Sequence, residues 1–194
     1  MKKAGIYILA VVFTTMAFAN PTNVFKKKLK VDTEKSTVIW KGYKPTGSHT
    51  GTINLTSGSL VLKGDNLVGG SFQVDMSTIK DKENNSRLEN HLKSKDFFEI
   101  DTYTSSKFEI VSSENKEGRT FITGNMTIKD VTEEVTFSAI VSETNDAVVV
   151  TTETFQINRA KFNITFKSKT FFNDLKDNFI NDEFDLQVTL IAPK

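Results

Sequence analysis

Residues 86–98 (SRLENHLKSKDFF) form the one stretch of helical pattern in a chain otherwise built of short strands with alternating apolar and polar residues. Ser86 followed by Glu89 has the spacing of a capping box, which predicts that a helix begins here. Leu88 and Leu92 would then share its buried face. One short helix cannot cover the apolar face of a large sheet. The sheet must therefore close on itself or pack on a second sheet, and the sequence predicts an all-β fold with this segment as a helical lid.

The strands are identified by alternation with a period of two residues. In residues 71–76, for example, Phe72, Val74 and Met76 alternate with polar residues. Strands are also predicted at 37–43, 50–55, 59–62, 107–111, 120–128, 135–141, 148–159 and 184–191, with a further pairing over 162–166. About eight strands is the size at which a barrel interior is filled by side chains or holds one small ligand. We therefore expect an antiparallel β-barrel of about eight strands.

The N-terminus has the pattern of an export signal. Two lysines, an apolar run over residues 4–18 and the A-x-A pattern at residues 17–19 predict a signal peptide over residues 1–19. Residues 20–29 are predicted to be a linker. Because no repeat or Pro-rich tract divides the rest, residues 30–194 are predicted to form one barrel domain.

The composition argues against several classes of function. The chain has no cysteine, so it offers no thiol nucleophile, no thiolate metal ligand and no attachment point for a lipoprotein anchor. We therefore expect a soluble exported protein, periplasmic or secreted. A net charge of +1 gives no electrostatic case for binding nucleic acid. The basic run Lys26–Lys28 leaves a transient membrane contact open, although a solvated linker is the favoured interpretation.

The aromatic residues indicate a dry interior. The chain has 16 Phe against one Trp and three Tyr, and an aromatic set without hydroxyl groups suits an apolar cavity better than a sugar-binding platform. The alternative is that these phenylalanines simply fill a core. From the apolar faces of the strands, the predicted cavity lining is Trp40, Phe72, Phe108, Phe137 and Phe155.

A set of short motifs also follows a characteristic order along the chain. It comprises His49 with Gly51–Ile53, Gly69–Phe72 with Asp75 and Ile79, His91–Ser94 with Asp96–Phe98, Phe108–Ile110, Gly124–Ile128, Val131–Thr132, Arg159 with Phe162–Asn163, and Asp182–Phe184. In this order the motifs resemble the YceI-like family of exported lipid- or polyisoprenoid-binding proteins with a lipocalin-like barrel. Asn90, Asp130 and Glu133 depart from the family pattern, at turn or surface positions that affect head-group details rather than the fold.

The resemblance implies a ligand class. Members of the YceI-like family hold amphiphiles with long apolar tails, such as isoprenoid quinones, polyprenyl phosphates or fatty amides. We therefore expect an isoprenoid or fatty-acid-derived lipid bound without chemical turnover. No cofactor is expected beyond that lipid, and a homodimer is left open. The alternative is a hydrolase or isomerase that acts on such a lipid through His91 and a nearby carboxylate. The sequence has no G-x-S-x-G elbow. We therefore predict that the protein has no catalytic residues and is not an enzyme.

The predicted mouth of the barrel combines the lid with an inward-facing arginine. Arg159 shares the face of Phe155 and Ile157, and a buried guanidinium needs an anion or several carbonyls. That anion is either the ligand head group or a structural partner such as Asp96 or Asp101, with the structural partner slightly favoured. Phe97 and Phe98 would plug the opening, and the resemblance adds His91 and Asn163 as neighbours of the head group.

The two histidines do not predict a metal site. His49 and His91 lie far apart in the sequence, and no spacing typical of metal ligands surrounds either one. A site that joins them to Asp96 or Asp101 is conceivable, but a hydrogen-bonded structural role is favoured for each.

Overall fold

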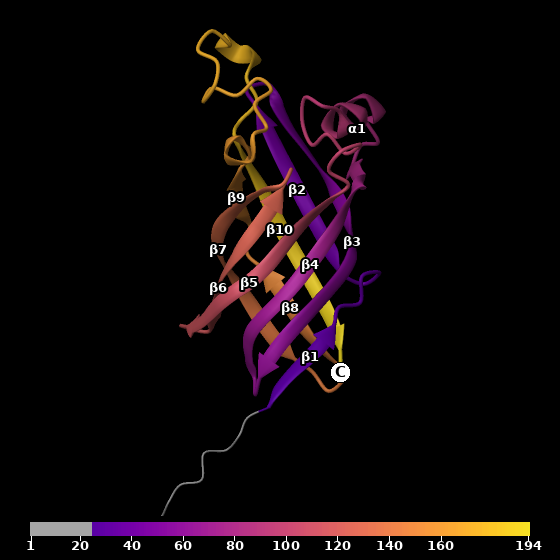
Figure 1. Ribbon diagram of the computed structural model, residues 1–194, viewed down its shortest axis with the longest axis vertical. Coiled ribbons are helices and arrows are strands. Elements are labelled where there is room, and N and C mark those ends of the chain that lie inside the picture. The colour runs from indigo at the N-terminus through magenta and orange to yellow at the C-terminus, as the bar shows by residue number, and fades with distance from the viewer. Residues whose placement is uncertain (1–24) are drawn as a thin grey trace, which may run out of the picture.

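The computed structural model describes residues 25–194, which form a closed barrel of eight antiparallel strands with one short helix (Figure 1). The elements are β1 (Lys26–Lys30), β2 (Thr37–Lys44), β3 (Gly47–Lys63), β4 (Asn66–Asp81), α1 (Ser86–Lys93), β5 (Ser105–Lys116), β6 (Arg119–Ile128), β7 (Val131–Glu143), β8 (Ala147–Thr152), β9 (Phe155–Asn158), η1 (Arg159–Phe162), η2 (Lys176–Asn178) and β10 (Glu183–Pro193). The predicted all-β barrel with a helical segment is confirmed. The predicted signal peptide lies outside the described residues.

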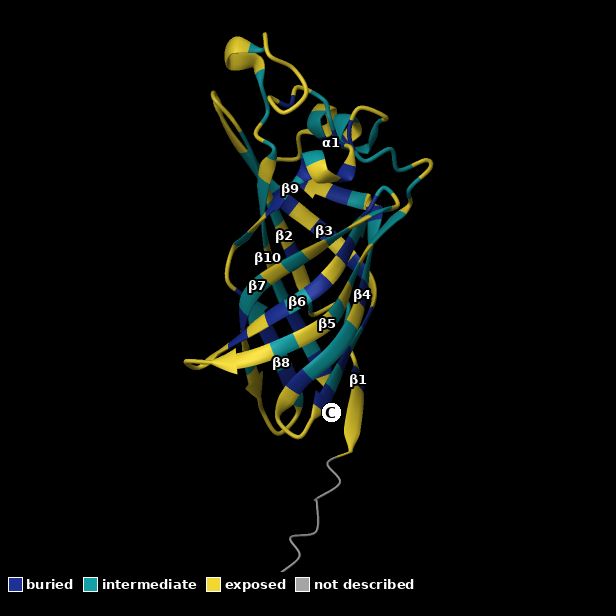
Figure 2. Ribbon diagram, turned by 60° about the vertical axis from the view of Figure 1, so that its left-hand side comes forward, coloured by how far each residue is buried: buried dark blue, intermediate teal, exposed yellow. Residues whose placement is uncertain are grey.

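Most strands pair with their neighbours in the sequence. Around the barrel the order is β3, β2, β10, β8, β7, β6, β5 and β4, and pairing between β4 and β3 closes the ring. The closure leaves the ring of eight strands without a free end, which is how a sheet without covering helices protects its backbone groups. Burial alternates along the strands, as Figure 2 shows, so one side of each strand faces the interior.

Two strands, β3 and β1, differ from what the sequence predicted. The predicted strands 50–55 and 59–62 are parts of one 17-residue strand, β3. Its register against β4 shifts between Thr52 and Asn54 and again between Leu55 and Ser57. Such bulges bend a long strand around a barrel, and here the polar residues between the apolar stretches occupy a bulge rather than a turn. The first strand, β1, lies partly in the predicted linker, because Lys26–Lys30 pair with Ser59–Lys63 of β3.

The predicted strand 148–159 is wrong in its second half. It stops at Thr152, resumes as β9 and ends before Arg159, which begins the short 3-10 turn η1. The Asn158 side chain accepts the backbone N–H of Ala160 at 2.9 Å and turns the chain out of the sheet. The predicted pairing over 162–166 is therefore absent, and residues 163–182 form a long segment at one end of the barrel, here called the mouth loop.

The helix begins one residue earlier than the capping box predicted. Asn85 is its N-cap, and the Asn85 side chain accepts the backbone N–H of Leu88 at 3.1 Å. Glu89 is only 7% exposed, although it carries a charge. Its carboxylate accepts the backbone N–H of Asp81 at 3.0 Å and the Lys80 ammonium at 3.1 Å. The helix is thus attached to the end of β4 by a carboxylate.

Glycines let two aromatic rings lie flat against the barrel wall. A Cβ at Gly51 would lie 2.5 Å from the Trp40 ring and 1.8 Å from the Lys80 carbonyl oxygen. A Cβ at Gly124 would lie 2.5 Å from the Phe108 ring. These positions admit only glycine without rearrangement, because the rings cover the backbone itself. Among the described residues, no helix is long and apolar enough to cross a membrane.

Candidate functional site

The barrel encloses a cavity of about 930 Å³. Its wall is mainly aliphatic and aromatic, and all five residues predicted to line it do so: Trp40, Phe72, Phe108, Phe137 and Phe155. That these side chains contact a ligand stays a prediction. The volume lies in the upper part of the range typical of small-molecule sites, which are also mostly apolar.

Three of the lining phenylalanines form one continuous surface. The Phe137 ring lies 4.2 Å from the Phe155 ring in a stacked arrangement and 5.3 Å from the tilted Phe108 ring. They come from β5, β7 and β9, which places them on one side of the barrel. Packing against each other holds these rings on the wall, so they border the cavity and do not fill it.

The cavity mouth is built from three elements. The turn between β2 and β3, the helix α1 and the mouth loop all contribute lining residues at the same end of the barrel (Figure 1). His91 of α1 contacts Phe166 of the mouth loop, with ring centroids 4.7 Å apart, and Phe97 at 5.1 Å. These contacts join the lid to the mouth loop. Sequence reasoning missed Phe166, because it assigned this residue to a strand.

His91 forms a pair with a carboxylate. Its Nε2 lies 3.3 Å from an oxygen of Asp96, and both side chains are partly exposed. The Ser94 hydroxyl donates to the backbone carbonyl of His91 and not to its ring. The histidine and carboxylate that the enzyme alternative needs are therefore adjacent, whereas this neighbouring hydroxyl is engaged by the main chain.

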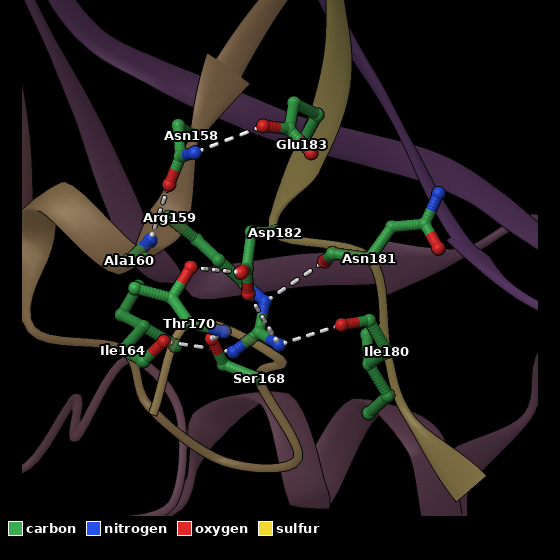
Figure 3. A network of polar contacts seen from close by, with 10 residues as sticks. All are labelled: Asn158, Arg159, Ala160, Ile164, Ser168, Thr170, Ile180, Asn181, Asp182 and Glu183. Atoms are coloured by element: carbon green, nitrogen blue, oxygen red, sulfur yellow. Dashed lines mark hydrogen bonds and ion pairs between the residues drawn. The ribbon is translucent and has the colours of Figure 1, made fainter. Parts of the chain in front are cut away.

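Arg159 is satisfied by the protein itself, as Figure 3 shows. The side chain is almost fully buried, and its guanidinium donates to the carbonyls of Asn181 at 3.0 Å, Ile164 at 2.7 Å and Ile180 at 2.9 Å. One nitrogen lies 3.2 Å from the Asp182 carboxylate. The structural partner is thus Asp182, and the expected Asp96 or Asp101 is wrong.

These contacts give Arg159 a clear role in the mouth loop. Burial lowers the pKa of Arg159 from its usual range, while the charges of Asp182 and Glu183 oppose this shift. Because four of its contacts hold residues at both ends of the mouth loop, the arginine fixes the base of that loop. Asn163 begins the loop in a left-handed conformation with φ of 57°, and it borders a second, smaller pocket instead of the main cavity.

Positive charge gathers at the mouth. Lys44, Arg87 and Lys167 are exposed and border the cavity from three different elements. None of them lies within ion-pair distance of a carboxylate in residues 25–194. The lining also includes Lys107 on β5, and its one carboxylate is Asp177. The three exposed cations at the rim can therefore bind an anion. The sequence did not indicate this group of charges, because the three residues are far apart in the chain.

The structure separates the two histidines into different pairs. His49 lies on β3 with its Nδ1 3.4 Å from an oxygen of the buried Asp81, while His91 faces Asp96. With Glu83, His49 and Asp81 form a group whose ligand atoms lie within 4.8 Å of one another, a spacing that could hold a divalent ion. A simple ion pair between His49 and Asp81 has the same geometry. The expected absence of a metal stays a prediction.

Comparison with known proteins identifies the family. The sequence model of the YceI-like domain matches residues 29–192. The chain belongs to the YceI-like domain family. This match includes almost the whole barrel and all three elements of the mouth, which confirms the resemblance seen in the motifs. No curated protein matches the chain.

Solved structures share the fold of this YceI-like chain at low sequence identity. BcnA of Burkholderia cenocepacia matches with a TM-score of 0.71 and 19% identity, over 84% of this chain and 99% of that one. A polyisoprenoid-binding domain from Saccharophagus degradans, implicated in plant cell wall breakdown, matches with a TM-score of 0.63 and 12% identity, over 84% and 97%. The YceI protein of Campylobacter jejuni matches with a TM-score of 0.55 and 16% identity, over 98% and 99%.

Two motifs of the YceI-like chain meet at Arg159. The pairing of β9 with β10 sets Asn158 opposite Glu183, and this register brings Arg159 beside Asp182. Asp182 belongs to the motif before the last strand, so both partners were visible in the sequence as separate motifs. The sequence did not reveal the register between β9 and β10, because residues 163–182 separate the two strands in the chain.

Proposed function

We propose that the protein is an exported carrier or sequestering protein that holds a long-tailed amphiphilic lipid without altering it chemically. The observation that carries this proposal is the apolar cavity of about 930 Å³, which opens at one end of a closed barrel. Membership of the YceI-like family supports it, as does the likeness to a structure described as a polyisoprenoid-binding domain.

Burial of the tail supplies the free energy of binding. Each methylene removed from water contributes about 0.8 kcal/mol, so ten of them contribute on the order of 8 kcal/mol before the costs of association. The aromatic wall of Phe108, Phe137 and Phe155 suits an unbranched or isoprenoid tail, because it offers broad contact without polar partners.

The charges at the mouth favour an acidic head group. Arg159 already has its partners, so a head group is left to the exposed Lys44, Arg87 and Lys167. A phosphate or carboxylate would pair with these cations, whereas a neutral quinone or amide would leave them without an anion. Among the ligand classes expected from the sequence, polyprenyl phosphates therefore fit best.

Mass spectrometry of an organic extract tests the proposal. The exported protein is purified from its native host without detergent and extracted beside a mock purification from a strain that lacks it. We expect one long-tailed lipid, chemically intact and enriched at close to one equivalent. A protein that carries no lipid, and takes none up when offered, would contradict the proposal.

The adjacent His91 and Asp96 support one alternative, a hydrolase or isomerase acting on the same lipid. Incubation of the bound lipid with wild-type protein and with His91→Gln separates the two functions. A carrier returns the lipid unchanged in both cases. Turnover by the wild type that disappears in His91→Gln would establish the enzyme.

Export is proposed from the sequence of residues 1–19. N-terminal sequencing of the protein recovered from outside the cytoplasm should read Asn-Pro-Thr, from cleavage after Ala19. A mature chain that keeps Met1 would contradict the periplasmic or secreted location.

A further inference from the structure

The middle of the mouth loop, here called its tip, exposes two adjacent aromatic side chains. Phe171 is 48% exposed and Phe172 is 49% exposed. The other large hydrophobic residues with high exposure are Phe25, at the start of the described chain, and Ile39, Val111, Phe121 and Ile140, each on a strand of the barrel wall. Single apolar residues on a wall are ordinary, but a neighbouring pair on the loop that borders the cavity mouth indicates a contact surface.

Basic residues lie in the same loop and around the cavity opening that this loop borders. Lys169 and Lys176 belong to the mouth loop, while Lys44, Arg87 and Lys167 border the same opening. The carboxylates of the loop are Asp174 and Asp177, since Asp182 is paired with Arg159. The loop thus has three lysines against two free carboxylates, and Asp177 is the one carboxylate among the cavity-lining residues, so the rim of the opening carries more basic than acidic side chains.

The tip is held in place before any partner binds. The backbone N–H groups of Phe171 and Phe172 both donate to the Ser168 carbonyl, at 3.2 and 3.0 Å. Ser168 is fully buried, and the Arg159 contacts fix the loop on either side of it. Presenting the aromatic pair therefore costs little ordering entropy when a surface is met.

We propose that the mouth loop docks on an anionic lipid bilayer, with Phe171 and Phe172 inserted at the interface and the surrounding cations against the head groups. Apolar insertion and attraction to anionic lipid together are what hold a peripheral protein on a membrane. The proposal rests on the proposed function and adds to it the membrane from which the lipid is taken or to which it is delivered. It turns the cavity mouth toward the bilayer, so a lipid tail passes between the two without crossing bulk water.

This docking surface differs from the basic run considered in the sequence. Lys26–Lys28 lie in β1, which pairs with the end of β3 next to the turn into β4. That turn is at the end of the barrel opposite α1 and the mouth loop (Figure 1). A contact through Lys26–Lys28 would therefore turn the mouth away from the membrane.

Vesicle flotation tests the surface. Vesicles of phosphatidylcholine with one third phosphatidylglycerol are compared with vesicles of phosphatidylcholine alone. The proteins are wild type, Phe171→Ser, the double variant Phe171→Ser/Phe172→Ser, and Ile140→Ser as a matched control on the wall of β7. All share the same N-terminus, so residues 1–24 contribute equally. The single variant is included because Phe172 borders the second pocket, which could matter for folding.

We expect the double variant to lose about tenfold or more in partitioning to the anionic vesicles, the single variant to lose less, and Ile140→Ser to bind as wild type. Binding should weaken with added salt and on phosphatidylcholine alone. Equal partitioning of wild type and the double variant, or an equal loss in Ile140→Ser, would overturn the docking surface. So would a concentration-dependent dimer that the double variant abolishes, because the pair would then bind a second copy.

A second measurement separates this inference from the proposed function. The lipid content of each folded variant is determined by mass spectrometry after delivery of the lipid from ethanol. The double variant should retain lipid delivered in this way yet take it up from vesicles more slowly. If the double variant retains lipid and also takes it up from vesicles as fast as the wild type, the docking surface is overturned and the carrier function stands. Loss of retention in every protein, wild type included, overturns the carrier.

Discussion

The Glu89 carboxylate in α1 accepts the backbone N–H of Asp81 at 3.0 Å, and this contact attaches the lid to the last residue of β4. The hydrogen bond from Asp81, followed by that from the Lys80 ammonium, holds the pKa of Glu89 below its ordinary value of 4.5, although burial acts in the opposite direction. The charged form therefore favours the docked helix. Because the pKa in the folded state is depressed, this contribution is present above about pH 4.5 and is lost as the pH falls below it.

The first prediction concerns the attachment of the lid. Glu89→Gln keeps an acceptor but loses the charge, so the amide protons of α1 should exchange about tenfold faster while the barrel strands keep their protection. In the wild type the same local loss should develop on acidification below pH 4.5. Hydrogen exchange read by mass spectrometry at pH 7 and pH 4 measures both effects.

The exposed Glu83 in the turn before α1 provides the control for the lid. Glu83→Gln removes a carboxylate of the same kind but keeps the hydrogen bond from the Asp81 backbone N–H to Glu89. The amide protons of α1 should therefore exchange as in the wild type. Unchanged exchange of α1 in Glu89→Gln would show that other contacts hold the lid.

The second prediction assigns Arg159 to the fold. Arg159→Leu leaves the largely buried Asp182 without its cation and three carbonyls without donors, so the free energy of unfolding should fall by about 3–5 kcal/mol. Arg119→Leu removes the exposed ion pair with Glu153 and should cost less than about 1 kcal/mol. Urea denaturation of both variants measures the difference. A stable Arg159→Leu protein that has lost only acidic lipids would restore the head-group role.

The third prediction places the lipid tail. Val188 lines the cavity from β10, so Val188→Phe should add volume to empty space and reduce lipid retention severalfold with a small change in melting temperature. Ala139 is 1% exposed and does not border the cavity, so Ala139→Phe should instead destabilise the barrel by about 1–3 kcal/mol. Retention unchanged in a folded Val188→Phe protein would place the tail outside the barrel.

The fourth prediction concerns head-group charge. The triple variant Lys44→Gln/Arg87→Gln/Lys167→Gln should retain phosphorylated or carboxylate lipids at least tenfold less than wild type, with neutral lipids of the same tail unaffected. Competition between a fatty acid and the matching fatty alcohol measures the selectivity. A triple change of Lys26, Lys27 and Lys28 to Gln removes the same charge at the opposite end of the barrel. This control variant should keep the selectivity for acidic lipids. Equal loss in both variants would mean that net charge alone, and not the mouth, sets the preference.

A barrel and the residues on its inner wall could be predicted from the sequence. Alternation with a period of two is a local property, and it places Trp40, Phe72, Phe108, Phe137 and Phe155 on the cavity face without knowledge of their neighbours. The scarcity of helical pattern then required the sheet to close on itself or pack on a second sheet.

The construction of the mouth depends on contacts that form only in the folded chain. Glu89 faces inward because the end of β4 offers an N–H and an ammonium, and Arg159 meets Asp182 because β9 and β10 pair in one register. The convergence of Lys44, Arg87 and Lys167 depends on three separate connections reaching one end of the barrel. Such contacts join residues distant in sequence, and side-chain periodicity along one strand carries no information about which other segment a charge will meet.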